Sequence, residues 1–482
     1  MARRKQQATT VSKKETKSTT VSKKDTKSTT APKKETKSTT APKKETKATT
    51  VSKKETKTTS GATTSRKRGK DSNTSENSQA KRIKLQPSIV KGHLLSCGQG
   101  DIGQLGQGED VFEKTRPGLV IFKDEKVTSD IVDIAAGGMH SVCLTSNGNV
   151  YTFGCNDEGA LGRVTEGEEG AEFVPRKVSL PCKIVQITAG DSHTAALSED
   201  GIVYLCGTFR DSSGKMGLIS PGKHEIAPIK LIEKIRIVKI ESGSDHLVCL
   251  SEDGDLYTCG CAEQGQLGRV AEYFASRGGR RGVVQNLAPA RLNMKKVKGK
   301  KLVFDDIWTG PYATYAKVKE TNEIFACGLN NYLQLGLDGM HSRFQPEFVK
   351  SFNGKNIKMI GGGQHHTIAL DSDGKAYALG RKEYGRLGLG ENCEDAATPT
   401  IITTLSESKC HQVDSGVCVS FAVDEEGKAY SWGMGTNSQL GHGDDEDRFV
   451  PTQMNSKMMT ARKSLKVCGG GQHTVILALN KE

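Results

Sequence analysis

Alternating apolar and polar residues recur along most of the chain in one repeated unit. In the copy AGGMHSVCLTSNGNVYTFGCNDEGALG, which runs from Ala136 to Gly162, a glycine-rich corner is followed by an alternating run and an Asn-Gly turn. A second alternating run ends at Gly154, and a polar tip closed by Ala-Leu-Gly follows. Alternation with a period of two indicates strands, and Asn-Gly between two such runs indicates a tight turn. The unit therefore predicts a β-hairpin between a corner and a tip.

Each half of the unit occurs seven times, but the chain begins and ends in different halves. The glycine that ends the second run recurs at Gly98, Gly154, Gly207, Gly260, Gly328, Gly380 and Gly433. The corner glycine recurs at Gly137, Gly190, Gly243, Gly310, Gly363, Gly416 and Gly470. The first copy lacks a corner and the last copy lacks a tip, so a ring in which they complete one another leaves no unpaired strand edge. We predict an all-β fold over residues 91–482, a seven-bladed β-propeller with a shared closing blade.

Composition narrows the class of protein. No apolar run approaches 18 residues, so we expect neither a membrane span nor a membrane partner. The 13 cysteines contain no CxxC pair, and several occupy a strand position that is Phe153 or Trp432 in other copies, which predicts small core residues: Cys97, Cys206, Cys259 and Cys327. A reducing compartment fits this pattern better than a disulfide or metal site.

Residues 1–90 differ from the remainder and form the second predicted region. They hold 25 lysines and arginines against 7 acidic residues, whereas residues 91–482 hold 44 against 49. Five lysine-rich decapeptides from Ala8 have almost no apolar content, so we expect a disordered basic tail that binds DNA phosphates. Basic clusters at 66–70 and 81–84 are spaced like a bipartite nuclear import signal, which predicts binding to nuclear import receptors.

Hairpin geometry predicts that all corners and tips lie at one end of the ring. Histidine recurs three positions after the corner glycine, and we expect these repeated rings to bond their own loops: His140, His193, His246, His366 and His473. Asymmetric recognition is expected from corner residues that differ between copies: Asp191, Asp245 and His365. Several tips are acidic, which suits a basic partner.

At this point the repeats resemble a known family. The [AS]-G-x-x-H corners, D-G turns, Q-L-G tips and the run RKEYGRLGLGE at 381–391 are similar to those of the regulator of chromosome condensation, the nuclear exchange factor for the small GTPase Ran. The resemblance covers residues 91–482. It implies a chromosome-associated nuclear protein that binds chromatin and promotes GDP release from Ran. Ran-GTP made at chromosomes would serve nucleocytoplasmic transport and spindle assembly. No covalent chemistry and no cofactor are implied.

The resemblance also implies site residues. The tip from Gly207 to Gly217 is two residues longer than the others, and it matches the wedge that enters the GTPase. Exchange is then assigned to Asp245, Asp191, His365, Phe209, Arg210 and Asp211. Further GTPase contacts are Asp101, His140, Asp157, Ser212, Ser213, Gly214, Glu263, Arg269 and His473, of which Asp157 and Glu263 are chosen from the acidic tips.

A basic excursion interrupts the otherwise acidic repeats, where one spacing grows to 68 residues. The resemblance implies that this segment corresponds to the chromatin-binding loops of the family. Candidates for the acidic histone surface of the nucleosome are Arg277, Arg280 and Arg281. Candidates for DNA phosphate are Lys295, Lys296, Lys298, Lys300 and Lys301.

Departures from the family and alternatives stay open at this point. Leu333 occupies a tip position where the family has histidine, and the start Met1-Ala2-Arg3-Arg4 lacks the family's methylated Pro-Lys sequence. No P-loop, metal-ligand cluster or catalytic triad spacing is present. The alternative function is a chromatin-binding scaffold without exchange activity. A light-sensing relative is disfavoured because only two tryptophans occur, and a propeller hydrolase because the blades offer no converging acid or metal site.

Overall fold

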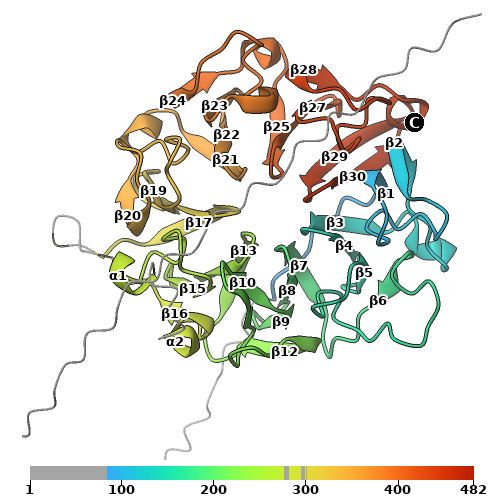
Figure 1. Ribbon diagram of the computed structural model, residues 1–482, viewed down its shortest axis with the longest axis horizontal. Coiled ribbons are helices and arrows are strands. Elements are labelled where there is room, and N and C mark those ends of the chain that lie inside the picture. Colours follow the sequence, from blue (N-terminus) through green and yellow to red (C-terminus); the bar gives the residue numbers. More distant parts are fainter. Residues whose placement is uncertain (1–83, 276–281, 295–298, 300, 482) are drawn as a thin grey trace, which may run out of the picture. The chain divides into compact units, whose positions relative to one another are not determined.

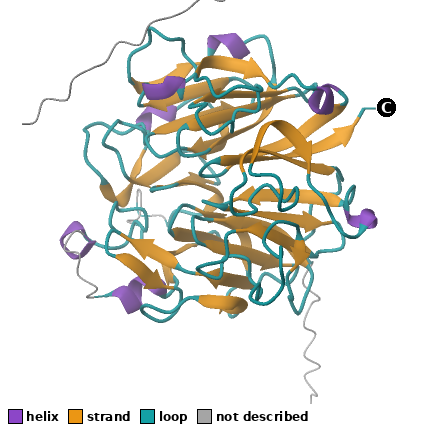
Figure 2. Cartoon of the chain, turned by 45° about the vertical axis from the view of Figure 1, so that its right-hand side comes forward, coloured by secondary structure: helices purple, strands orange, loops and turns teal. Residues whose placement is uncertain are grey.

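The computed structural model describes residues 84–275, 282–294, 299 and 301–481, and these form a ring of seven four-stranded antiparallel sheets. Figure 1 looks down the axis of the ring, and Figure 2 shows the same sheets from an oblique side. The predicted seven-bladed propeller is confirmed. Within the described residues no helix has the length and apolar character needed to cross a membrane.

The blades are numbered in chain order, each from its inner to its outer strand. Blade 1 is β3 (Ile131–Ala136), β4 (His140–Thr145), β5 (Val150–Gly154) and β6 (Arg176–Lys177); blade 2 is β7 (Ile184–Ala189), β8 (His193–Ser198), β9 (Val203–Gly207) and β12 (Glu225–Ile232); blade 3 is β13 (Ile237–Ser242), β14 (His246–Ser251), β15 (Leu256–Gly260) and β16 (Ala290–Arg291). Blade 4 is β17 (Phe304–Gly310), β18 (Ala313–Val318), β19 (Ile324–Gly328) and β20 (Arg343–Phe348); blade 5 is β21 (Ile357–Gly362), β22 (His366–Asp371), β23 (Ala376–Gly380) and β24 (Ala396–Ile401); blade 6 is β25 (Cys410–Ser415), β26 (Val419–Asp424), β27 (Ala429–Gly433) and β28 (Arg448–Gln453).

Blade 7 closes the ring with strands from both ends of the sequence. It has the order β2-β1-β30-β29 and consists of β29 (Arg462–Gly469), β30 (His473–Asn480), β1 (His93–Gln99) and β2 (Glu113–Leu119). Strands β1 and β30 are antiparallel, with partners from His93 opposite Ala478 to Gly98 opposite His473. The predicted shared closing blade is therefore confirmed.

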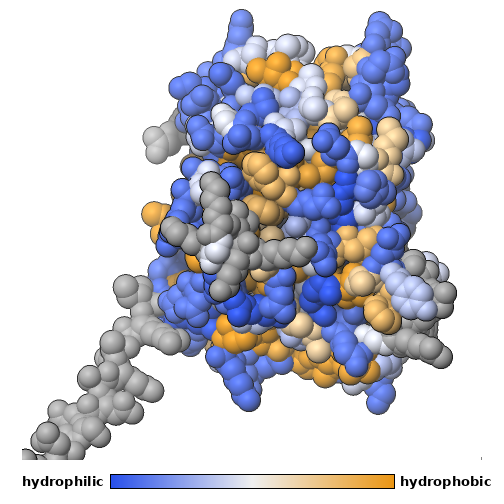
Figure 3. All heavy atoms as spheres, turned by 90° about the vertical axis from the view of Figure 1, so that its left-hand side faces the viewer, coloured by the Kyte–Doolittle hydropathy of each residue, from blue (hydrophilic) through white to orange (hydrophobic). Residues whose placement is uncertain are grey.

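The remaining elements are short and lie between the blade strands. They are the hairpin β10 (Phe209–Asp211) and β11 (Gly214–Gly217), the helices α1 (Glu272–Ala275), α2 (Val283–Leu287) and α3 (Lys457–Thr460), and the 3-10 turns η1 (Glu125–Val127), η2 (Lys350–Phe352), η3 (Glu383–Gly385) and η4 (Thr403–Leu405). The space-filling view toward the side where β20 and α1 lie in Figure 1 shows hydrophilic residues with apolar ones between them (Figure 3).

Corners and tips lie at the same end of the ring, as predicted. The residue after each repeat glycine donates its amide to a carbonyl of its own corner, for example Cys155 N to Met139 O at 2.9 Å and Cys261 N to Asp245 O at 2.7 Å. The repeat glycine has a positive φ in all seven copies, and a Cβ on Gly154 would lie 2.6 Å from Met139 O. Only glycine accepts this backbone and this close approach.

The repeated histidines join neighbouring blades and do not bond their own loops. Each ring is buried, and each Nε2 lies 2.8–3.0 Å from a hydroxyl of the next blade; the pairs are His140–Thr194, His193–Ser242, His246–Thr314, His366–Ser420 and His473–Ser141. The hydroxyl of Thr194 in turn donates to Ala160 O in the preceding tip at 2.8 Å. That hydroxyl therefore accepts from His140 Nε2, which carries a proton, and because burial lowers the pKa of His140 to about 4 the ring is neutral at pH 7. The predicted structural role is correct, but its predicted target was wrong.

Two corners lack the histidine, and other groups join the blades there. Ala313 and Val419 occupy the histidine position in blades 4 and 6. Between blades 4 and 5 the hydroxyls of Tyr315 and Thr367 lie 3.0 Å apart. Between blades 6 and 7, Thr474 Oγ1 donates to Gln439 O at 2.7 Å. Every junction in the ring thus has a polar bond beside its apolar contacts.

Apolar side chains fill the spaces between blades, and the predicted core cysteines are among them. Cys97, Cys206, Cys259 and Cys327 are at most 2% exposed, and all 13 cysteines are unpaired. Burial raises the pKa of each of these four thiols to about 12, so they stay protonated and behave as small apolar groups.

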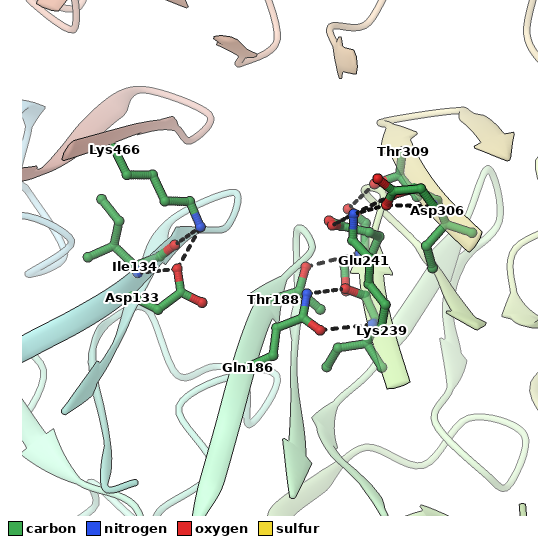
Figure 4. A network of polar contacts seen from close by, with 12 residues as sticks. Asp133, Ile134, Gln186, Thr188, Lys239, Glu241, Asp306, Thr309 and Lys466 are labelled. Carbon is green, nitrogen blue, oxygen red and sulfur yellow. Dashed lines mark hydrogen bonds and ion pairs between the residues drawn. The ribbon is translucent and has the colours of Figure 1, made fainter. Parts of the chain in front are cut away.

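A channel runs along the ring axis, lined by the inner strands, with a volume of about 460 Å³. Ion pairs between blades lie along it (Figure 4): Lys466 Nζ is 2.7 Å from Asp133 Oδ1, and Lys239 Nζ is 2.6 Å from Asp306 Oδ1. Lys239 Nζ also lies 3.3 Å from Glu241 Oε1 on its own strand, β13. Gln186 exchanges two hydrogen bonds with the backbone of Ile240, at 2.9 and 3.0 Å. Polar bonds therefore link the inner strands as well.

We predict that His246→Gln makes the stability of the ring less sensitive to acid. Burial lowers the pKa of His246 to about 3, whereas the unfolded chain has an ordinary histidine pKa of about 6.5. As the pH falls from 7.5 to 5, only the unfolded chain takes up a proton, so the wild type loses about 2 kcal/mol at this residue and the variant does not.

The measurement is urea unfolding followed by tryptophan fluorescence at pH 7.5 and 5. The variant should be less stable at pH 7.5 by about 1–3 kcal/mol, because a buried bond is lost, and the deficit should shrink at pH 5. The exposed His341 provides the control variant His341→Gln, which should change the unfolding free energy by less than about 0.5 kcal/mol. A deficit equal at both pH values would contradict the assignment.

Candidate functional site

The longer tip forms a small hairpin on the loop face, which is the end of the ring that carries all corners and tips. Strands β10 and β11, which come between β9 and β12 in the sequence, pair with one another in a separate two-stranded sheet. The turn is Asp211-Ser212-Ser213-Gly214, in which Ser213 N donates to Asp211 Oδ1 at 2.9 Å. Gly214 has φ +106° with no atom within 4 Å of its Cβ position, so it is needed for the turn and projects into open space.

The base of the hairpin is anchored in the core. Phe209 is fully buried, its ring lies 4.7 Å from that of His193 in an edge-on contact, and Met216 on the other strand is 4% exposed. Phe209 was predicted to take part in exchange. Its observed place makes it an anchor for the exposed crest, and a direct part in exchange stays a prediction.

Asp245 in the corner of blade 3 contacts this hairpin. Its Oδ1 accepts the backbone amide of Arg210 at 2.7 Å. The acid and the crest, which lie 35 residues apart, therefore share one side of the ring, as the sequence predicted. Burial raises the pKa of Asp245 to about 7, the carboxylate of Asp191 adds to the rise, and the Arg210 amide opposes it.

Two glutamates hold the hairpin from both sides. From blade 1, Glu158 Oε1 lies 3.0 Å from Arg210 Nη1 and Glu158 Oε2 lies 2.5 Å from Lys215 Nζ. From blade 3, Glu263 accepts Ser212 N at 3.0 Å and Ser212 Oγ at 2.5 Å. The sequence predicted Glu263 only as a GTPase contact, and it missed Glu158 and Lys215. Nothing in the chain order indicates that Glu158 meets a loop some 52 residues later.

The other predicted GTPase contacts differ in accessibility. Asp101 and Asp157 are exposed on their tips, and Asp191 is exposed at the mouth of the channel. His365 is half-buried with its ring edge-on to Tyr332 at 5.1 Å, and burial lowers its pKa. These acids and the histidine differ from blade to blade around the loop face, which makes that face asymmetric.

Three predicted contacts are engaged inside the protein. His140 and His473 are 1% exposed and bond the next blade. Arg269 Nη2 donates to the carbonyls of Gln285, Asn286 and Ala288 at 3.0–3.2 Å, which ties the α2 segment to blade 3. A contact of any of the three with a GTPase stays a prediction.

Most of the predicted chromatin residues lie outside the described part of the chain. These are the tail to residue 83 with both basic clusters apart from Lys84, and the loop residues Arg277, Arg280, Arg281, Lys295, Lys296, Lys298 and Lys300. Lys301 is described, and its Nζ lies 2.7 Å from Asp255 Oδ1. Lys84 Nζ pairs with Glu199 Oε1 at 2.7 Å.

Leu333, at the tip where the family has histidine, has φ +61°. The equivalent tip position holds glycine with positive φ in other blades, such as Gly159 and Gly265. Leucine in this left-handed conformation is strained, so the tip backbone is fixed by its surroundings.

The described residues contain no group of three or more metal-ligating side chains that could hold an ion. The loop face instead offers carboxylates, a projecting hairpin and a partly basic crest. Such a surface suits recognition of a protein partner through charge and shape.

Comparison with known proteins agrees with this geometry. A family model described as the RCC1-like domain matches residues 93–476. The regulator of chromosome condensation of Xenopus laevis is 50% identical, over 83% of this chain and 94% of the relative, and the guanine nucleotide exchange factor SRM1 of Saccharomyces cerevisiae is 29% identical, over 84% and 90%. The crystal structure of Saccharomyces cerevisiae Prp20p, described with its binding to Gsp1p and histones, aligns with a TM-score of 0.74 at 28% identity, over 83% and 94%. With this fold, these repeats and this identity, the chain belongs to the regulator of chromosome condensation family.

Proposed function

We propose that this chain is a guanine-nucleotide exchange factor that promotes GDP release from the nuclear small GTPase Ran while bound to chromatin. The observation that carries the proposal is the hydrogen bond between Asp245 and the Arg210 amide, because it joins the hairpin to the acidic corners in one surface. The family relation supports it, since one relative is named an exchange factor.

The mechanism needs no covalent step. The acidic loop face docks on a basic surface of the GTPase, and the crest from Arg210 to Gly214 displaces elements that hold the nucleotide. An acceleration on the order of 10⁵-fold corresponds to roughly 7 kcal/mol of barrier, and several desolvated charge contacts of about 2–5 kcal/mol each supply that amount. Because coupling is reciprocal, nucleotide must weaken binding of the factor, and GTP releases it.

Exchange and chromatin binding are assigned to different regions. Ran is proposed to bind the loop face, and import receptors the basic clusters at 66–70 and 81–84. The acidic histone surface of the nucleosome is assigned to Arg277, Arg280 and Arg281. DNA is assigned to the tail and to the lysines from Lys295 to Lys301. A chain with these partners would be a nuclear, chromosome-associated exchange factor.

The direct test uses purified chain and Ran loaded with a fluorescent GDP analogue in excess GTP. We expect accelerated loss of the fluorescent nucleotide at catalytic amounts of the chain. Nucleosome binding without accelerated release would favour the scaffold alternative and overturn the proposal.

We predict that Asp245→Asn lowers the exchange rate at saturating Ran by about 100-fold, while affinity for nucleotide-free Ran falls less than about tenfold. Wild-type kcat/KM should rise with pH through about 7, because the carboxylate becomes ionised there, and the variant should lack this rise. Stopped-flow fluorescence from pH 6 to 8 measures both. Asp253→Asn, in an exposed turn at the opposite end of the ring, is the matched control. Equal losses of rate and affinity would remove Asp245 from the exchange step.

We predict that deletion of residues 1–83 weakens nucleosome binding and leaves exchange unchanged. The deletion ends before Lys84 and Leu85, so their contacts with Glu199 are kept. Lost phosphate contacts should make the slope of log affinity against log salt shallower by about 0.9 per contact. Titrations at two salt concentrations measure this slope. An unchanged slope would show that the tail does not bind DNA.

A further inference from the structure

The carboxylate of Glu158 receives a cation from each strand of the hairpin. It lies in the tip after β5, in the blade preceding the hairpin, and is 19% exposed. Arg210 on β10 approaches Oε1 at 3.0 Å, and Lys215 on β11 approaches Oε2 at 2.5 Å. Lys215 Nζ also lies 3.0 Å from His224 Nδ1. One acidic side chain therefore bridges the two strands of the hairpin, β10 and β11.

Arg210 and Lys215 are also direct cross-strand partners. Like charges in this position repel one another and destabilise a hairpin. The two strands are three and four residues long, and a two-stranded hairpin of this size is marginal without outside support. Glu158 lies between the two cations and converts their repulsion into attraction toward blade 1.

We propose that Glu158 is a positioning residue that holds the hairpin in the orientation required for nucleotide exchange. This inference rests on the proposed exchange function and deepens it. Glu158 acts through Arg210 and Lys215 and need not touch the GTPase itself. The two ion pairs fix the side of the hairpin that faces blade 1, while Glu263 and Asp245 fix the side that faces blade 3.

The arrangement predicts movement of the hairpin, not unfolding, when Glu158 is neutralised. Phe209 stays buried at the base, so the base stays in place while the exposed crest gains freedom to move. Both cations are partly exposed, at 46% for Arg210 and 32% for Lys215, and ion pairs with partly exposed partners add little to global stability. A loosened hairpin must be ordered again when it displaces the nucleotide, so the cost appears in the exchange step.

The test uses the full-length chain with Glu158→Gln, which keeps the shape and removes the charge. At saturating Ran the exchange rate should fall by about tenfold, while affinity for nucleotide-free Ran changes less than about threefold. Glu158→Asp, which keeps the charge on a shorter side chain, should recover part of the rate.

The matched control is Asp255→Asn. Asp255 also receives two cations, Arg291 at 2.9 Å and Lys301 at 2.7 Å, and is 16% exposed, but it lies in the turn between β14 and β15 at the opposite end of the ring. This variant loses an equivalent pair of contacts away from the hairpin, so its exchange rate should equal that of the wild type.

A second measurement is independent of the GTPase. Hydrogen–deuterium exchange at the amides of Arg210 and Ser212 should be about tenfold faster in Glu158→Gln than in the wild type, and unchanged in Asp255→Asn. Equal amide protection in Glu158→Gln and wild type would overturn the proposal that Glu158 holds the hairpin in place. Faster amide exchange together with an unchanged or increased rate of nucleotide exchange would overturn the role of Glu158 in nucleotide exchange. It would show that the contact of Glu158 with the hairpin only restrains it. A wild-type chain without nucleotide-exchange activity would overturn the proposed function. Amide exchange alone would then test whether Glu158 holds the hairpin.

Discussion

The ring depends on a buried polar bond at each junction between blades. At five junctions a buried histidine shares a hydrogen bond with a hydroxyl of the next blade, and at the others Tyr315 or Thr474 makes the bond. At the corners that carry histidine, the glycine leaves room for the imidazole ring: a Cβ on Gly243 would lie 2.1 Å from His246 Cε1. An apolar interface alone tolerates sliding, whereas a buried hydrogen bond has one register. The repeated G-x-x-H pattern therefore sets the angle at which successive blades meet.

That fixed frame explains where recognition can vary. The tip amides are held by corner carbonyls, so tips and corners keep the same backbone while their side chains differ. Asp245, Asp191 and His365 occupy equivalent corner positions of different blades, and the ring turns their sequence differences into an asymmetric surface. The hairpin of blade 2 extends this logic, because its crest is held by carboxylates of blades 1 and 3. Recognition is thus a property of three adjacent blades and not of one loop.

The features of the fold that depend on periodicity could be predicted from the sequence. Seven glycines at near-constant spacing, and halves missing at opposite ends, determine the blade number, the closing blade and the common end of corners and tips. Prediction from the sequence failed for contacts between a side chain of one blade and the neighbouring blade. The histidines were expected to bond their own loops, and no pattern showed that Thr194 or Ser420 would lie opposite them. Glu158 was missed for the same reason, since contacts between blades depend on the angle of packing and not on spacing along the chain.

The closing blade has a consequence for how the chain is made. Strand β1 pairs with β30, which ends at Asn480, so the first strand to leave the ribosome waits for the last. Until then β1 can pair with β2 on one edge, but its other edge, which β30 covers in the finished ring, stays open beside the apolar residues Leu94 and Leu95, both at most 2% exposed once the ring is closed. A nascent chain with such an open edge is prone to association. Release of the final strand is therefore the event that turns an aggregation-prone intermediate into a closed molecule.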